Sequence, residues 1–171
     1  METRSRPLDV GSTAPGFALE TAWGVETTLA SLLMEGPLLV EFVRGTWDPG
    51  TRQRLKDLTA YHSEFRDRDC RVVVVVCERQ ETVDAYLAAG PVPFPVLIDG
   101  DRNVTRAYGV WQRFSLPKGN IARPSSFLMD RCGYVQYAYV ARLQIHAASL
   151  EEILRALESL NTDARSRPGP R

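Results

Sequence analysis

Five consecutive valines, Val72–Val76, constrain the fold of this chain more than any other feature. Valine is branched at Cβ, which favours strands over helices. A strand with one face in water alternates apolar and polar residues, whereas this run is apolar at every position, so both of its faces must be covered. Such strands lie inside sheets that carry helices on both sides. The run therefore predicts an α/β fold with a buried strand over residues 71–77.

The rest of the chain alternates apolar runs of strand length with segments of helical period, which fits such a fold. Before the valines, an apolar run at residues 37–43 is followed by apolar residues at helical spacing from Leu55 to Phe65. After them, the pattern predicts a helix at 82–89, a strand at 94–98, a helical turn at 104–108, a hairpin with arms at 126–129 and 134–140, and an amphipathic helix from Ser149 to about 160. This order describes an α/β sandwich around a mixed sheet.

Length and charge limit the domain count and the class of partner. The 171 residues suit one domain, which we expect at residues 10–160 between flexible polar ends at 1–9 and 161–171. Because 21 Lys and Arg balance 21 Asp and Glu, no net field would attract nucleic acid or an anionic membrane. No apolar run suits a membrane span or a signal peptide. The three cysteines cannot all pair within one chain, so we predict reduced thiols and a cytoplasmic protein.

The stretch best placed for chemistry is residues 42–52, Phe-Val-Arg-Gly-Thr-Trp-Asp-Pro-Gly-Thr-Arg, where the first long strand passes into its helix. In open α/β sheets, ligands gather at the carboxyl ends of strands, where helix N-termini offer free N–H groups and the positive end of a dipole. Asp48 is a good N-cap residue, and Pro49 suits the first helical turn. We therefore predict that the helix begins at Pro49, with Asp48 in the field of its N-terminus.

Four segments resemble, in the same order, the peroxiredoxin-like proteins of the alkyl hydroperoxide reductase and thiol-specific antioxidant superfamily. Residues 44–51, RGTWDPGT, are similar to the family's RGxWCPxC, and residues 15–19, PGFAL, to its opening PxFxL. Residues 93–110, PFPVLIDGDRNVTRAYGV, resemble its FPvLxDxxxxxaxxYGV block, and residues 123–133, RPSSFLMDRCG, resemble RPxTFxIDxxG. The resemblance implies a thioredoxin-like fold of the peroxiredoxin type.

The resemblance also identifies the positions at which family members carry reactive cysteines. The first cysteine of the motif attacks a peroxide as a thiolate, whose pKa is lowered at the helix N-terminus, and a resolving thiol then forms a disulfide. In this chain those positions hold Asp48 and Thr51. A carboxylate cannot become a sulfenic acid, and a hydroxyl cannot resolve one. Asp48 either keeps the negative charge of the lost thiolate or serves simply as a helix cap.

The matched motifs suggest five further residues for the edge of a pocket, namely Arg44, Thr46, Trp47, Arg123 and Pro124. Arg44 would neutralise Asp48 or hold an anionic ligand, or else lie with its head group in water. Trp47 would form a flat wall, or else pack as an ordinary aromatic residue. Arg123 is the nearest match to an arginine that helps many peroxiredoxins bind peroxide. Pro124 resembles a proline that faces the active site in thioredoxin folds, or else only closes a turn.

Cys77 is the best remaining candidate for a reactive thiol, because it follows the valine run at the carboxyl end of a strand and should open toward the same edge of the sheet as residue 48. Arg79 would lower its pKa and Glu78 would raise it. The alternative is a small buried core residue. Cys70 is expected at the far end of the sheet, and Cys132 in the hairpin turn.

The sequence carries no other catalytic or cofactor motif. His62 and His146 lack the spacing of metal ligands. Ser125 and Ser126 have no histidine base near them in the sequence, and neither a GxSxG elbow nor a phosphate-binding glycine loop occurs. We therefore expect no metal and no cofactor.

Two functions are compatible with these residues, and they differ in whether the chain is an enzyme. The first is a redox-inactive derivative of a peroxiredoxin-like protein, which binds a protein partner or a small ligand at the pocket edge. The second is a thiol-dependent peroxidase or oxidoreductase that uses Cys77 or an external thiol such as glutathione. The resemblance also allows a homodimer.

Overall fold

The valine run forms the centre of the fold in the computed structural model, which describes residues 6–113, 119–143 and 146–166. The valines lie in β4 (Arg71–Val76), which runs parallel to β3 (Leu38–Phe42) on one side and to β5 (Val96–Ile98) on the other. Alternate valines face opposite apolar clusters, with Val72, Val74 and Val76 on one side and Val73 and Val75 on the other. The predicted burial of both faces is confirmed.

The sheet around β4 is mixed, as predicted. Its seven strands lie in the order β2-β1-β5-β4-β3-β8-β9, and every pair except β3–β4 and β4–β5 is antiparallel. The remaining strands are β1 (Ala18–Thr21), β2 (Glu26–Thr28), β8 (Ser125–Met129) and β9 (Val135–Val140). β8 and β9 form the predicted hairpin, in whose turn Asp130 Oδ1 accepts hydrogen bonds from the N–H groups of Cys132 and Tyr134.

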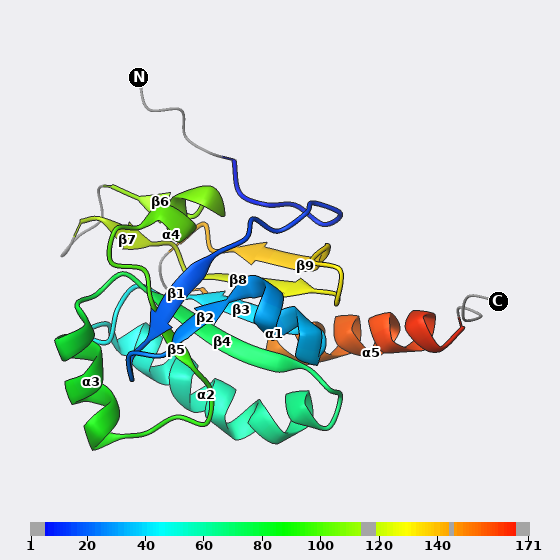
Figure 1. The fold of residues 1–171 in the computed structure, drawn as a ribbon, viewed down its shortest axis with the longest axis horizontal. Helices are drawn as coiled ribbons and strands as arrows, with labels where there is room; N and C mark the ends of the chain where they lie inside the picture. The colour runs from blue at the N-terminus through cyan, green and yellow to red at the C-terminus, as the bar shows by residue number, and fades with distance from the viewer. Residues whose placement is uncertain (1–5, 114–118, 144–145, 167–171) are drawn as a thin grey trace.

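Helices cover both faces of this sheet (Figure 1). The first apolar cluster lies beneath α2 (Pro49–Arg66), α3 (Gln80–Ala89) and α5 (Leu150–Ser166). The second lies beneath α1 (Leu29–Glu35) and α4 (Asn103–Ala107). Consequently β3 and β4 are buried between two layers, and α2 begins at the carboxyl end of β3.

Several short elements were not predicted, and the two ends differ from the expected boundaries. The sequence patterns missed β1, β2, α1 and a separate two-stranded sheet of β6 (Trp111–Gln112) and β7 (Ile121–Ala122). α5 continues through Ser166, beyond residue 160. Near the N-terminus, Leu8 packs against the second cluster and donates its N–H to the carbonyl of Tyr108. The outer parts of the expected flexible ends, residues 1–5 and 167–171, lie outside the described residues.

No helix within the described ranges is both long and apolar enough to cross a bilayer.

Candidate functional site

The start of α2 places Asp48 at the edge of the sheet. The helix begins at Pro49 with Asp48 as its N-cap, as predicted, and Asp48 Oδ2 accepts a hydrogen bond of 2.8 Å from the N–H of Thr51. A side chain that accepts from the third residue of a helix satisfies one of its free N–H groups. Asp48 and Thr51 are both buried, although α2 opens at the surface with Gly50 exposed.

A buried ion pair fixes the other oxygen of Asp48. Arg44 Nη1 donates to Asp48 Oδ1 at 2.8 Å, and the exposed fractions of the two side chains are only 8% and 10%. The Arg44 guanidinium also lies over the ring of Trp47, 5.0 Å from its centroid. Charge-assisted hydrogen bonds of this kind are among the stronger ones in proteins. Arg44 therefore pairs with Asp48, and its head group does not lie in water.

Glu78 and Arg52 form hydrogen bonds with the backbone of the loop between β3 and α2. The N–H of Thr46 donates to Glu78 Oε2 at 2.6 Å, and its carbonyl accepts from Arg52 Nε at 2.6 Å. Gly45 has a φ of +150°, and a Cβ there would collide with the Trp47 ring and approach Glu78 Cδ to 3.1 Å. This position therefore requires glycine. Thr46 contributes its backbone to the loop, and it is not among the residues that line the pocket described next.

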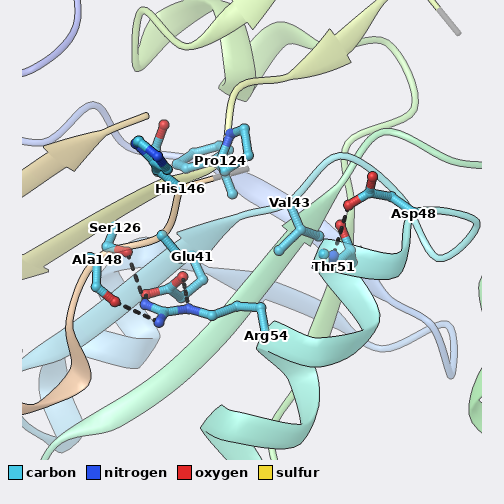
Figure 2. A pocket seen from close by; sticks show the side chains of 13 residues that line it. Glu41, Val43, Asp48, Thr51, Arg54, Pro124, Ser126, His146 and Ala148 are labelled. Atoms are coloured by element: carbon cyan, nitrogen blue, oxygen red, sulfur yellow. Dashed lines mark hydrogen bonds and ion pairs between the residues drawn. The ribbon is translucent and has the colours of Figure 1, made fainter. Parts of the chain in front are cut away.

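A pocket opens between the start of α2, the ends of β3 and β8, and the loop that leads into α5 (Figure 2). It has about 430 Å³ of empty volume, its open mouth included. Asp48, Gly50 and Thr51 line it from α2, and Pro124 lines it from the start of β8. The structure thus brings together three of the predicted site residues, namely Asp48, Thr51 and Pro124. Arg44, Trp47 and Arg123 do not line it, and Arg123 Nη2 instead donates to the carbonyl of Ala141 at 2.9 Å.

The floor of the pocket contains a second buried ion pair that was not predicted. Arg54 donates from Nε and Nη2 to the two oxygens of Glu41, at 3.0 and 2.8 Å. It also reaches Ser126 Oγ at 3.2 Å and the carbonyl of Ala148 at 2.7 Å, as the dashed lines in Figure 2 show. Burial by itself would lower the pKa of Arg54, but the charge and hydrogen bonds of Glu41 raise it, so the guanidinium keeps its charge. Arg54 joins α2, β3, β8 and the loop before α5.

The same loop brings His146 to the pocket, together with Ala147 and Ala148. His146 is almost a hundred residues from Asp48 in the sequence, and no spacing connects the two. It lines the pocket alongside Ser125 and Ser126, which the sequence alone left without a neighbouring histidine. Across the described ranges, no three His, Cys, Asp or Glu side chains gather in a group that could hold a metal.

A family model and several relatives place this chain among known proteins. The model of the AhpC/TSA family matches residues 10–138, which is most of the chain. The chain belongs to the AhpC/TSA family. It is 28% identical over 151 residues to the bcp protein of Helicobacter pylori strain J99, whose name places it among the peroxiredoxins, and the match covers 86% of this chain and 98% of that protein. It is 32% identical over 104 residues to the thiol-disulfide oxidoreductase ResA of Bacillus subtilis, covering 60% and 57%.

Solved structures show that this AhpC/TSA protein has a peroxiredoxin-like, thioredoxin-type fold, as predicted. The crystal structure of peroxidoxin BcpB from Mycobacterium tuberculosis matches with a TM-score of 0.79 at 20% identity, over 88% of this chain and 97% of that chain. The reduced 2-Cys peroxiredoxin of Plasmodium vivax matches with a TM-score of 0.80 at 20% identity, over 96% and 90%.

The three cysteines of this AhpC/TSA protein all lie in the described part of the chain, and none lines the pocket. All three are unpaired. Cys77 belongs to the second apolar cluster, on the face of the sheet opposite α2, and burial raises the pKa of its thiol to about 11. Burial likewise raises the pKa of Cys70 to about 12, and Cys132 is exposed in the hairpin turn.

The surroundings of Cys77 differ from those expected from its sequence neighbours. Its Sγ lies 3.2 Å from Thr105 Oγ1, and the positive charge of Arg102 only partly offsets the effect of burial on the thiol pKa. Glu78 bonds to the Thr46 backbone instead, and Arg79 precedes the first residue of α3. Cys77 is thus a buried core thiol, as in the alternative reading of the sequence.

Proposed function

We propose that this chain is a redox-inactive member of the AhpC/TSA family that binds a ligand in the pocket beside Asp48. The observation that carries the proposal is the position and bonding of the Asp48 carboxylate. Its carboxylate caps α2 where the family motif carries the attacking cysteine, and its two oxygens bond to Arg44 and to the Thr51 N–H. A carboxylate held in this way can keep a negative charge at the helix N-terminus, but it has no sulfur atom to accept oxygen from a peroxide.

The thiols that remain support the same proposal. A reactive cysteine needs a low pKa and access to its substrate. Cys77 and Cys70 are buried with raised pKa values, and the exposed Cys132 lies in the turn between β8 and β9 rather than at the pocket. Unpaired thiols fit a reducing compartment, so we place the protein in the cytoplasm as part of the proposal.

Consumption of hydrogen peroxide with excess dithiothreitol tests the loss of redox activity. We expect the wild-type protein and the Cys77→Ser variant to consume peroxide no faster than dithiothreitol alone. Turnover well above that background in the wild type, lost in Cys77→Ser, would instead establish a thiol peroxidase that uses Cys77. Turnover that survives Cys77→Ser would also contradict the proposal.

A revertant provides the positive control for the same assay. The double variant Asp48→Cys/Thr51→Cys puts a thiol at the N-terminus of α2, where the helix dipole lowers thiol pKa values. We expect the thiol introduced at position 48 to react with peroxide at least about a hundredfold faster than any wild-type thiol. This factor follows if its pKa lies about two units below the pKa values of the wild-type thiols. If it reacts no faster, Asp48 does not occupy a site built to activate sulfur.

A further inference from the structure

Two glutamates face each other across the outermost pair of strands. β2 is an end strand of the seven-stranded sheet, and its register with β1 places Glu20 directly opposite Glu26. Residues directly opposite in an antiparallel pair share one face, with their Cβ atoms about 4.5–5.5 Å apart. Both side chains are exposed, and neither carboxylate forms an ion pair with a residue that the structure describes. Because like charges in this arrangement are destabilising, the pair costs stability that the fold alone does not require.

The turn between these two strands carries an apolar tip. Trp23 and Val25 are each 61% exposed, although both are large apolar residues. They flank Gly24, whose φ of +74° is a conformation that glycine adopts without strain. The turn lies beside the start of α3, where Gln80 Nε2 donates to the carbonyl of Ala22 at 3.1 Å (Figure 1). Two exposed apolar side chains therefore lie, along the chain, between the two glutamates.

Hydrogen bonds to Thr21 hold this turn in one conformation. The buried hydroxyl of Thr21 accepts from the N–H groups of Trp23 and Val25, both at 3.2 Å. The Thr21 backbone closes the turn, because its N–H donates to the carbonyl of Val25 at 2.8 Å and its carbonyl accepts from the N–H of Gly24 at 2.9 Å. A partner that contacts Trp23 would therefore not have to order the backbone of the turn, and this lowers the entropic cost of binding.

We infer that residues 20–26, the acidic hairpin tip, dock a basic segment of a protein partner in which an arginine or lysine lies beside an apolar side chain. A cation between Glu20 and Glu26 would relieve their repulsion and form charge-assisted hydrogen bonds. The same cation can approach the face of the Trp23 ring, and the apolar side chain can pack against Val25. Tryptophan is among the residues that dominate binding energy at protein interfaces. The tip contributes no residue to the pocket, so this inference goes beyond the proposed function.

Three acetylated and amidated pentapeptides test the inference on the full chain: Gly-Arg-Leu-Arg-Gly, Gly-Gln-Leu-Gln-Gly and Gly-Glu-Leu-Glu-Gly. Titration followed by NMR chemical shifts gives a Kd for each peptide and the residues affected. We expect the arginine peptide to shift the amides of residues 20–26 with a Kd at least about tenfold below that of the glutamine peptide, and the glutamate peptide not to bind. Added salt should raise the Kd of the arginine peptide, because exposed charges are screened. An arginine peptide that binds no more tightly than the glutamine peptide, or that shifts other parts of the chain instead, would overturn the inference.

Two variants test the apolar and the acidic parts of the tip separately. We expect Trp23→Ala and Glu26→Gln each to raise the Kd of the arginine peptide about threefold or more. Met34→Ala removes an apolar side chain that is 83% exposed on α1, and Asp163→Asn removes an exposed carboxylate from α5. These controls should leave the Kd unchanged. If either variant of the tip binds as the wild type does, or if the controls weaken binding equally, the inference is wrong.

The stability of Glu26→Gln distinguishes a binding role for the glutamates from a structural one. Because Glu20 and Glu26 repel each other, this variant should unfold at a higher urea concentration than the wild type while it binds the arginine peptide more weakly. A urea midpoint that does not rise would remove the basis of the inference.

Sedimentation of the wild-type chain alone tests whether a second copy covers the tip instead. A dimer that dissociates in Trp23→Ala would show that the occupant is another copy of this chain, and the inference of a basic partner would be wrong. We expect Trp23→Ala to sediment as the wild type does. None of these results depends on peroxide turnover, so this inference and the proposed function fail separately.

Discussion

At the scale of single residues, Thr105 is the side-chain hydrogen-bond partner of the buried Cys77 thiol. Thr105 Oγ1 donates to Asp99 Oδ2 at 2.6 Å, and because a hydroxyl has one hydrogen, the contact of 3.2 Å with Cys77 must use the thiol as donor. Thr105→Val keeps the side-chain shape but leaves the buried thiol without an acceptor and removes one bond to Asp99. We expect a loss of about 1–3 kcal/mol in the free energy of unfolding, measured with urea.

Thr105→Ser is the matched control, because it keeps the hydroxyl and should cost clearly less than valine does. A loss in Thr105→Val no larger than that in Thr105→Ser would show that the hydrogen bonds of the hydroxyl contribute no more to stability than the methyl group does.

The same residues show what the sequence could and could not predict about a site. Asp48 was predictable because capping is local: the cap, the proline and the first turn are adjacent in the chain. The side of the sheet that Cys77 faces could not be predicted from the sequence. Residues of one strand alternate between two faces, and only the tertiary structure shows which face α2 covers. His146 reaches the pocket through the loop before α5, and no local pattern links it to Asp48.

At the scale of elements, the stability of the first turn of α2 depends on the two bonds of Asp48. Asp48→Ala removes the cap, worth about 1 kcal/mol, and leaves Arg44 buried without its carboxylate, which costs several kcal/mol more. Asp48→Asn retains the cap and loses only the charge. We expect Asp48→Ala to lower the free energy of unfolding by about 3 kcal/mol or more, and Asp48→Asn by less. Urea titrations of both variants measure the two contributions, and an Asp48→Ala protein as stable as the wild type would contradict this account.

The elements also differ in how well the sequence predicts them. β4 and α2 carry their own signals, namely a run buried on both faces and an apolar stripe at helical spacing. β6 and β7 have two residues each, too few to show a period. They exist because Trp111 and Gln112 pair with Ala122 and Ile121 across an intervening segment, which is information that no local window contains.

At the scale of the whole molecule, the burial of one thiol on each face of the sheet lowers the free energy of unfolding at alkaline pH. The thiols of Cys70 and Cys77 have pKa values raised by burial to about 12 and about 11, whereas a cysteine in the unfolded chain ionises near pH 9. Above pH 9, the unfolded chain releases these protons and the folded chain retains them, so the free energy of unfolding falls with rising pH. Below pH 9, the two states hold the same protons and this contribution is constant.

Urea unfolding at pH 8 and pH 10 measures the effect. Each buried thiol should reduce the free energy of unfolding at pH 10 by about 1 kcal/mol, because one unit of pH above the unfolded pKa corresponds to about that energy. Cys77→Ser removes one of these thiols. The free energy of unfolding of this variant should therefore fall between pH 8 and pH 10 by about 1 kcal/mol less than that of the wild type. Cys132→Ser removes an exposed thiol from the hairpin turn and should not change the loss. If the wild type and Cys77→Ser lose the same stability, Cys77 is not held as a protonated thiol in the folded protein.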